Sequence, residues 1–176
     1  MPNVNPTPPA GTAGFNALSV AEAEAGLLTC CASRAFARQV AARRPYRDLA
    51  ELAETAVAAV RALAWPDVQE ALEAHPRIGE RAGGAGREAS WSRREQSGVA
   101  AAGQAVLDGL AEGNRAYEER FGHVYLVCAT GLTAEEMLSR LRGRLRNDDD
   151  AEHGVVRAEL AEITRLRVAK LLEETA

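Results

Sequence analysis

Hydrophobic residues recur every three or four positions along most of the chain, which is the spacing of one face of an α-helix. Residues that cap helices precede several of these runs, namely Ser19, Ser33, Asp48 and Thr133. Ser19 and Thr133 are each followed three positions later by a glutamate, which completes a capping box. The pattern predicts about eight helices, at roughly 19–31, 33–44, 49–64, 67–74, 92–121, 133–146 and 151–173, with the run 92–121 interrupted near Gly98, Gly103 or Gly113.

One short stretch does not follow this spacing. Residues 124–129 are hydrophobic at almost every position, which suits a buried strand and a buried helix equally well. Because no second strand signal exists with which it could pair, we expect a buried helix or an extended coil. The whole pattern predicts an all-α protein with a single compact domain over residues 15–176. Residues 1–14, rich in Pro, Gly, Thr and Asn, are expected to form a disordered lead-in.

The composition agrees with closely packed helices, because aromatic residues make up only 5% of the chain and alanine is abundant. The net charge is −4 and Lys170 is the only lysine, so the chain lacks the basic excess of a nucleic-acid binder. No hydrophobic run is long enough to cross a membrane. Residues 1–14 do not resemble a signal peptide, and residues 173–176 do not resemble a peroxisomal signal.

The chain has three cysteines, Cys30, Cys31 and Cys128. Adjacent cysteines are badly placed to pair with each other, and no CxxC spacing of a metal site occurs. We therefore expect free, buried thiols in a reducing compartment, which predicts a cytoplasmic location.

His75 is one of only three histidines and is followed directly by Pro76. The proline ends the preceding helix and restricts the backbone that presents the imidazole ring. A histidine at a helix end can be a proton-transfer group, because its pKa lies near neutrality. The simpler interpretation is a capping residue whose charged form is favoured by the negative end of the helix dipole.

Ser92, Glu95 and Gln96 are spaced so that all three side chains project from one helical face. If a helix begins at Ser92, a carboxylate in its first turn is stabilised by the positive end of the helix dipole. These residues can then hold or relay a proton for a substrate. The alternative is that Ser92 and Glu95 form an ordinary capping box.

Arg167 falls on the hydrophobic stripe of the last helix, in line with Leu160, Ile163 and Leu171, whereas Arg165 points away from it. A guanidinium on such a face is costly unless it has an anionic partner. Arg167 is therefore either a binding group for a substrate carboxylate or carbonyl, or one member of a structural ion pair.

Other polar positions have simpler explanations. His123 is expected to be a packing or loop residue, and His153, in an acidic stretch, a solvated surface residue. A metal site made of His75, His123 and Glu95 stays open, although no HxxxH or HExxH spacing occurs. The glycine-rich loop expected over residues 80–89 lacks the features of a phosphate-binding loop and is expected to be mobile.

Taken together, these segments resemble one family, the 2-oxo-4-hydroxy-4-carboxy-5-ureidoimidazoline (OHCU) decarboxylases of urate breakdown. The resemblance spans residues 15–172 and departs from the family pattern only in detail, at Tyr46 and His123. The matching motifs are Arg44-Pro45-Tyr46, His75-Pro76-Arg77-Ile78-Gly79, Ser92-x-x-Glu95-Gln96, Asn114-x-x-Tyr117-Glu118-x-x-Phe121-Gly122, Arg144-Leu145-x-Asn147-Asp148 and Ile163-Thr164-x-Leu166-Arg167.

The resemblance implies an all-helical homodimer that needs neither a metal nor an organic cofactor and acts on a small molecule, OHCU. It implies that His75 and Glu95 are the catalytic pair, moving a proton and orienting the substrate. The implied substrate-binding residues are Pro76, Ser92, Gln96, Leu126, Val127, Cys128, Ala129 and Arg167, with backbone groups contributing at 126–129.

The implied reaction is loss of CO2 from OHCU to give (S)-allantoin. The carboxylate leaves a carbon next to an imine, which can accept the electron pair, and one proton must then arrive on a single face. Two alternatives remain: another lyase acting on a ureido or imidazoline substrate, and a non-catalytic helical interaction module. The module interpretation predicts that His75, Glu95 and Arg167 lie apart on the surface.

Overall fold

Helices account for the secondary structure in this computed structural model, which describes residues 11–80 and 83–174, and no strand occurs in those two segments. The predicted all-α fold is confirmed. The described residues form, in chain order, α1 (Gly11–Ala17), α2 (Val20–Cys30), α3 (Arg34–Ala42), α4 (Leu49–Arg61), α5 (Trp65–Leu72), α6 (Arg87–Glu95), the 3-10 turn η1 (Ser97–Val99), α7 (Gln104–Phe121), α8 (Ala134–Arg144) and α9 (Asp149–Glu174).

Four of the helices begin where the capping residues predicted. The hydroxyls of Ser19 and Thr133 each accept a hydrogen bond from the backbone three residues ahead, and both capping boxes are complete. The side chains of Ser33 and Asp48 cap α3 and α4 in the same way. These starts depend on neighbours in the sequence, which explains why the sequence alone located them.

The chain becomes helical earlier than predicted. α1 begins at Gly11, so residues 11–14 belong to a helix and not to the lead-in expected over 1–14, whereas residues 1–10 lie outside the described part. Phe15 of this helix is fully buried, and its backbone oxygen accepts a hydrogen bond from Arg44 at 3.1 Å. Contacts with distant residues stabilise α1, and a search for local helix signals does not detect them.

The prediction that Ser92 opens a helix is wrong. α6 begins at Arg87 after the uncapped Gly86, so Ser92 lies in its second half. Tertiary contacts support the earlier start: the Trp91 indole donates to Glu174 at 2.9 Å, and Arg87 pairs with Glu174 at 2.7 Å. These contacts are made with the C-terminal end of α9, so the pattern of neighbouring residues in the sequence does not predict them.

The long helical run is interrupted before Gly103, at η1, and continues unbroken through Gly113 in α7. A glycine is required at 113 by packing: a Cβ atom there would lie 2.5 Å from a methyl group of Leu141 on α8. Gly109 meets Leu138 in the same way, at 2.9 Å. The two glycines therefore allow α7 and α8 to approach each other closely.

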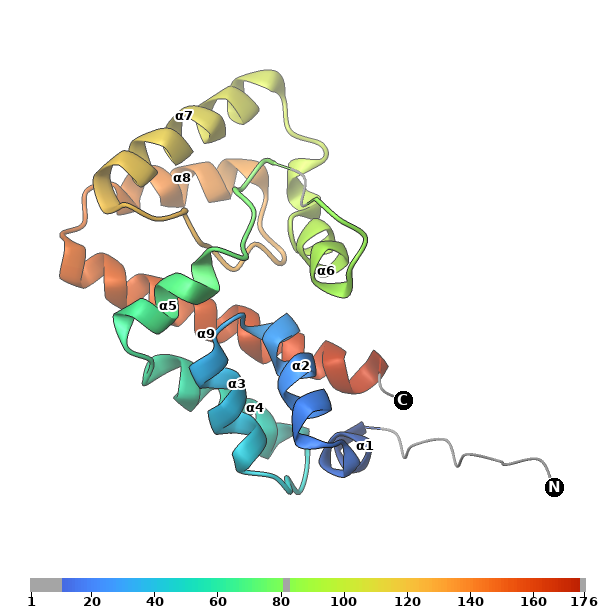
Figure 1. Cartoon of the computed structure of the whole chain (residues 1–176). Coiled ribbons are helices and arrows are strands. Elements are labelled where there is room, and N and C mark those ends of the chain that lie inside the picture. The colour runs from blue at the N-terminus through green and yellow to red at the C-terminus, as the bar shows by residue number, and fades with distance from the viewer. Residues whose placement is uncertain (1–10, 81–82, 175–176) are drawn as a thin grey trace.

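The helices enclose two hydrophobic cores. The larger core is built by α1 to α5 together with α9, and the smaller core by α7 and α8. In Figure 1, α9 crosses the middle of the molecule, with α7 and α8 above it and α1 to α4 below it. α6 stands at one side, near α2 and the C-terminal end of α9 (Figure 1).

Residues 124–129 form an extended segment between the two cores. Of the two predicted possibilities, a buried helix and an extended coil, the second is the one found. Its residues alternate between the cores, as they would along a strand. This alternation explains a run that is hydrophobic at nearly every position. Val124, Leu126 and Cys128 pack with the larger core, and Tyr125, Val127 and Ala129 with the smaller one.

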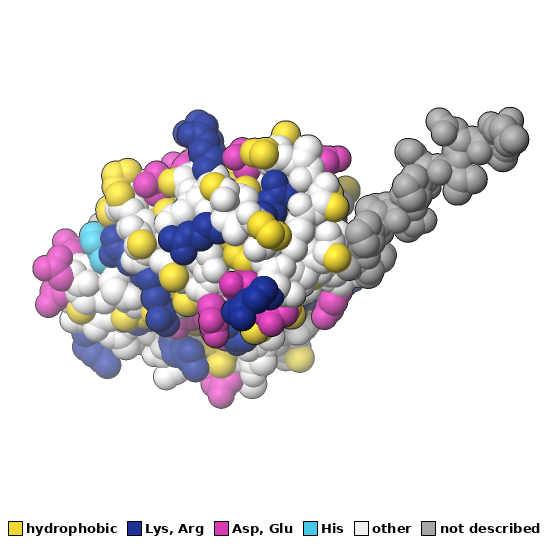
Figure 2. All heavy atoms as spheres, turned by 90° about the horizontal axis from the view of Figure 1, so that it is seen from below, with side chains coloured by type: hydrophobic (Ala, Val, Ile, Leu, Met, Phe, Trp, Pro, Cys, Tyr) yellow, Lys and Arg dark blue, Asp and Glu magenta, His cyan; other side chains and the backbone are white. Residues whose placement is uncertain are grey.

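The face seen in Figure 2 shows basic and acidic side chains intermingled, with scattered hydrophobic groups between them. Such a mixed surface is unlike the single-sign patch that binds a nucleic-acid backbone. Within residues 11–80 and 83–174, no helix has the length and apolar character needed to span a membrane.

Candidate active site

His75 lies on the loop that follows α5. The helix ends at Leu72, and two turn hydrogen bonds extend it, the second from the backbone N–H of His75 to the oxygen of Leu72 at 3.0 Å. Pro76 follows and directs the chain away toward Ile78, whose oxygen accepts a hydrogen bond from Asn114 of α7 at 2.8 Å. The imidazole is thus presented from a loop that is fixed at both ends.

The environment of His75 favours its neutral form. Burial of the ring, and then the nearby positive charge of Arg167, lower the pKa of His75 from 6.5 to about 3. Neither ring nitrogen makes a hydrogen bond to another described residue, so the ring has a lone pair available at neutral pH. The capping interpretation requires a charged ring, and this environment disfavours it.

Arg167 is almost fully buried, at 1% exposure, on the hydrophobic stripe of α9 that the sequence predicted. Its Nε and Nη2 atoms donate to the two carboxylate oxygens of Glu95, both at 2.9 Å. Nη2 also donates to the hydroxyl of Ser92 at 3.1 Å. A bidentate pair of this kind fixes both side chains in orientation as well as distance.

Glu95 therefore lies at the C-terminal end of α6, where the helix dipole disfavours a negative charge. Arg167 and the ammonium of Lys170, which lies 3.6 Å from Glu95, offset this effect. The prediction that a helix N-terminus stabilises the carboxylate of Glu95 is therefore wrong. Two cations from α9 thus contact the carboxylate of Glu95.

One nitrogen of Arg167 remains free for a ligand. Nη1 makes no hydrogen bond to any residue in the described part of the chain. A guanidinium that already has a bound carboxylate and still has an unused N–H pair can orient a second anionic or carbonyl oxygen.

Gln96 connects the two motifs that carry the candidate chemistry. Its side-chain oxygen accepts a hydrogen bond from the backbone N–H of Gly79 at 3.0 Å. Gly79 has a φ of +92°, a backbone conformation that side chains other than glycine adopt rarely. The His75 loop and the end of α6, separated by 17 positions at this bond, are thus held together.

A cavity of about 290 Å³ lies between the His75 loop and α6, and we call it the α6 pocket. Three of the predicted site residues line it: His75, Pro76 and Ser92. Arg167 donates to the Ser92 hydroxyl and to Glu95, but neither Arg167 nor Glu95 is among the described residues that line the cavity. The remaining lining residues are Glu73, Ala74, Gly83, Glu88 and Ala89.

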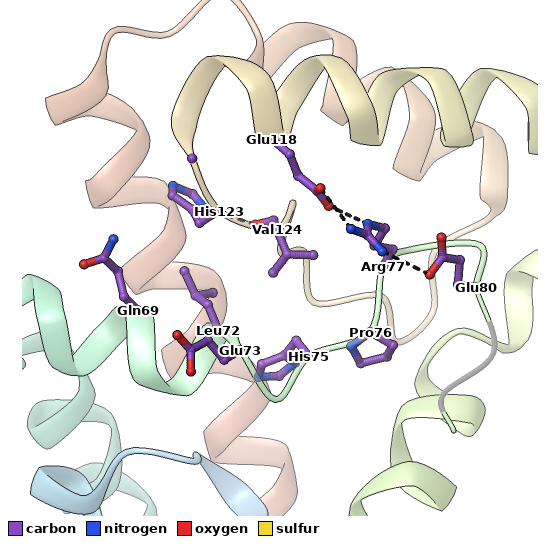
Figure 3. Close-up of a pocket in the computed structure, with 11 residues that line it drawn as sticks. Gln69, Leu72, Glu73, His75, Pro76, Arg77, Glu80, Glu118, His123 and Val124 are labelled. Atoms are coloured by element: carbon purple, nitrogen blue, oxygen red, sulfur yellow. Dashed lines mark hydrogen bonds and ion pairs between the residues drawn. The ribbon is translucent and has the colours of Figure 1, made fainter. Parts of the chain in front are cut away.

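His75 also borders a second cavity, of about 580 Å³, which we call the His123 cavity. Figure 3 shows His75 and Pro76 along one edge of it and His123 and Val124 on the other side. Arg77 lies there as well, paired with Glu118 at 2.6 Å and with Glu80 at 3.6 Å (Figure 3). This pairing neutralises the arginine that lines the cavity among the described residues.

His123 is a packing residue, as predicted: its ring lies 5.4 Å from that of Trp65 and 5.5 Å from that of Tyr117. His153 differs from the solvated residue that was expected. Its ring stacks on Trp65 with centroids 3.6 Å apart. Within the described residues, no group of three His, Cys, Asp or Glu side chains is placed to hold a metal ion.

The segment 126–129 is tied to the protein through its backbone. The oxygen of Leu126 accepts a hydrogen bond from Arg144 at 2.6 Å, and the N–H of Cys128 donates to Glu159 at 2.7 Å. Val127 and Ala129 are buried. None of the four is among the described residues that line the two cavities bordered by His75, so their contact with substrate stays a prediction.

The cysteines are free thiols, as expected. Cys30 and Cys31 are buried, and this burial raises the pKa of each to about 12. Cys128 is half-buried, and burial raises its pKa as well. The raised pKa values favour neutral, unreactive thiols.

Glu88 is a polar residue of the α6 pocket that the sequence analysis did not identify. Glu88 lies on α6 four positions before Ser92 and seven before Glu95, so the three share a helical face. This spacing was readable in the sequence, but the helix was expected to begin only at Ser92. The error in the helix boundary therefore hid a pocket residue.

Comparisons with known proteins agree with this fold. The family model described as OHCU decarboxylase matches residues 16–169. The uric acid degradation bifunctional protein TTL of Arabidopsis thaliana is 33% identical over 156 residues, covering 84% of this chain and 46% of that protein. The bifunctional protein PucL of Bacillus subtilis (strain 168) is 24% identical over 139 residues, covering 79% of this chain and 28% of that protein. The chain thus spans less than half the length of these two relatives.

Two solved structures are similar as well. A crystal structure of OHCU decarboxylase in the presence of (S)-allantoin has a TM-score of 0.72 and 33% identity, covering 83% of this chain and 96% of that one. A crystal structure of (S)-allantoin synthase has a TM-score of 0.68 and 18% identity, covering 92% of this chain and 54% of that one. The second likeness concerns the fold alone.

The fold and the site define an all-helical protein in which a loop histidine faces a pocket backed by a buried arginine–glutamate pair. The chain belongs to the OHCU decarboxylase family.

Proposed function

We propose that this protein decarboxylates OHCU to (S)-allantoin in the breakdown of urate. The observation that carries the proposal is that His75 and Ser92 both line the α6 pocket. The imidazole of His75 is neutral there, and the Ser92 hydroxyl accepts a hydrogen bond from Arg167, which also binds Glu95. Family membership and the likeness to an OHCU decarboxylase structure support it.

In the proposed reaction, the bond between the ring carbon and its carboxylate breaks and CO2 leaves. The electron pair forms a carbon–carbon double bond, and the imine electrons move to the ring nitrogen. The resulting enol still has its hydroxyl group. His75, being neutral, accepts the hydroxyl proton as a general base, a role that contributes roughly 10²–10⁴-fold to a rate.

Glu95 acts in this proposal as a fixed acceptor. Because its side chain is fixed by the ion pairs with Arg167 and Lys170, its carboxylate oxygens are suited to accept hydrogen bonds from the ureido N–H groups of the substrate. The free Nη1 of Arg167 is suited to contact a substrate oxygen. Ser92 and Gln96 would bind further polar edges of the substrate, and Pro76 and the backbone of 126–129 would contact it as well.

The interaction-module alternative fares worse. It requires Ser92 to be a helix cap, whereas Ser92 lies within α6. It also predicts that the three key residues lie apart, whereas Arg167 is close enough to His75 to lower its pKa and is bonded to Glu95. One part of it stands, since the Arg167–Glu95 ion pair exists.

The test is to generate OHCU in situ from urate and to follow (S)-allantoin by circular dichroism, with and without the protein. We expect the protein to accelerate formation of the optically active product above the spontaneous, racemic decay. His75→Ala should reduce this acceleration by roughly 10²–10⁴-fold. No acceleration by the wild-type protein would refute the proposal, and unchanged turnover by His75→Ala would refute the role of His75.

We further propose that the chain forms a homodimer and acts in the cytoplasm. The family resemblance supports the dimer, and the free thiols support a reducing compartment. Light scattering coupled to size exclusion would give the mass directly. A mass of 18.8 kDa, that of one chain, would contradict the dimer.

A further inference from the structure

Decarboxylation of OHCU needs a proton donor, and none of the residues implied by the family resemblance was assigned that role. The substrate enters as a carboxylate anion and CO2 leaves uncharged, so each turnover consumes one proton. His75 can take the hydroxyl proton and pass it to the ring nitrogen that holds the displaced electrons. A second group must deliver a proton to the former imine carbon, and to one face of it only.

Glu95 is poorly suited to be that donor. Both of its carboxylate oxygens accept hydrogen bonds from Arg167 at 2.9 Å, and Lys170 adds a second positive charge. Both oxygens of Glu95 thus already act as hydrogen-bond acceptors within the protein, so the side chain is not positioned to donate a proton to a substrate.

Glu88 is the carboxyl group of the α6 pocket that lies on the same helix face as Ser92 and Glu95. It is partly buried and makes no hydrogen bond or ion pair with any residue of the described chain. It lines the same cavity as His75, from α6, whereas His75 lies on the loop after α5. A substrate in this cavity would be within reach of both an imidazole and a carboxyl group that has no partner among the described residues.

We infer that Glu88 is a catalytic acid of the proposed decarboxylation, donating a proton to the former imine carbon of the enol intermediate. In this step the O–H bond of the Glu88 carboxyl breaks and a carbon–hydrogen bond forms. The enol hydroxyl loses its proton to His75, which returns it to the ring nitrogen. Glu88 then regains a proton from solvent, to which the pocket is open.

The electrostatic surroundings of Glu88 fit this role. Burial raises its pKa; the positive charge of Arg167 acts against this shift, and the negative charge of Glu95 adds to it. Glu73 and His75 are the other titratable groups lining the pocket. The same site therefore contains a carboxyl group whose pKa is raised and an imidazole whose pKa is lowered. A pair of groups with pKa values displaced in this way marks an acid and a base.

The inference depends on the proposed function, and two separate readouts test it. CO2 release reports decarboxylation, and circular dichroism reports (S)-allantoin. For Glu88→Gln we expect CO2 release to continue while the intermediate is protonated by water on either face. The optical purity of allantoin should fall, and the rate of (S)-allantoin formation should fall by roughly 10²-fold or more.

Glu73→Gln is the matched control, because Glu73 also lines the pocket but is exposed. It should leave optical purity unchanged. Glu88→Asp retains an acid and should restore part of the optical purity that Glu88→Gln loses. A thermal melt of each variant shows whether it is folded. We expect Glu88→Gln to fold, because Glu88 makes no hydrogen bond or ion pair with the residues that the structure describes.

The pH profile gives a second, independent test. A catalytic acid works when protonated, so wild-type activity should decrease as pH rises through the raised pKa of Glu88. Glu88→Gln should lack this decrease, and Glu73→Gln should keep it. A Glu88→Gln variant that makes optically pure (S)-allantoin with the wild-type pH profile would overturn the inference. Absence of any wild-type acceleration would instead overturn the proposed function.

Discussion

Arg167 and Glu95 hold each other in one geometry between α9 and α6, although 72 positions separate them in the chain. The side chains are only 2% and 10% exposed, so each charge depends on the other for compensation. The sequence predicted that Arg167 needs an anionic partner, and that prediction is confirmed. It left the partner open, because 25 acidic residues were available and spacing ranks none of them.

Glu95→Gln should therefore lower the free energy of unfolding markedly, by about 3–5 kcal/mol, because it leaves a buried guanidinium without a counter-charge. The control is Glu162→Gln, which breaks the exposed pair of Glu162 with Arg165 on the same helix α9, where the side chains are 45% and 49% exposed. That change should cost less than about 1 kcal/mol. Urea unfolding measures both, and equal effects would contradict the burial argument.

His75 links stability to pH. Its pKa in the folded protein, about 3, lies below the ordinary value of 6.5, so between these values the unfolded chain binds a proton that the folded protein does not. The free energy of unfolding should fall as pH decreases from 6.5 toward 3. His75→Gln should weaken this dependence, as measured by urea midpoints across the window. Midpoints that depend on pH identically in both proteins would show that His75 carries no such effect.

At the scale of the element, the sequence located the helices with side-chain caps and misplaced the start of α6, which has no such cap. α2, α3, α4 and α8 begin at capping residues that bond within three positions. α6 follows the uncapped Gly86, and distant contacts of Trp91 and Arg87 with Glu174 support it. Because the start of α6 was predicted at Ser92, Glu88 was placed outside the helix and was not considered as a candidate site residue.

The pair α7 and α8 gives an element-scale prediction. Gly113→Ala should destabilise the protein by about 1–3 kcal/mol, since the new Cβ would lie 2.5 Å from Leu141 and force the helices apart. This cost should exceed the gain in helix propensity, which is at most about 1 kcal/mol. Gly154→Ala in α9 is the control, because nothing lies within 4 Å of its Cβ position. It should be neutral or stabilising, and a thermal melt of both variants distinguishes the two cases.

At the scale of the whole molecule, the extended segment 124–129 and the buried residue Glu152 join the two cores. Arg144 of α8 pairs with Glu152 of α9 at 2.5 Å and also donates to the oxygen of Leu126. The hydroxyl of Tyr117 donates to the same carboxylate from α7. Three helices and the segment are thus connected through one carboxylate and one guanidinium.

Arg144→Met should cost about 3–5 kcal/mol of unfolding free energy, because it leaves the carboxylate of Glu152, fully buried at 0% exposure, without its cation. Arg34→Met is the control. It removes the arginine of an exposed pair with Glu70, in which the Arg34 side chain is 74% exposed, and should cost less than about 1 kcal/mol. Chemical denaturation followed by far-ultraviolet circular dichroism measures the difference. A small effect of Arg144→Met would show that the cores are joined mainly by hydrophobic contact.

The sequence by itself determined the helical class, the capped helix starts and the burial of Arg167, because each depends on residues within a few positions or on one face of one helix. Its motifs also indicated the family. Only the tertiary structure decided that Glu95 is the partner of Arg167, that His75 is held neutral, and that Glu88 shares a pocket with it. These properties arise from burial and from charges brought together across α5, α6 and α9, and no local pattern encodes such distances.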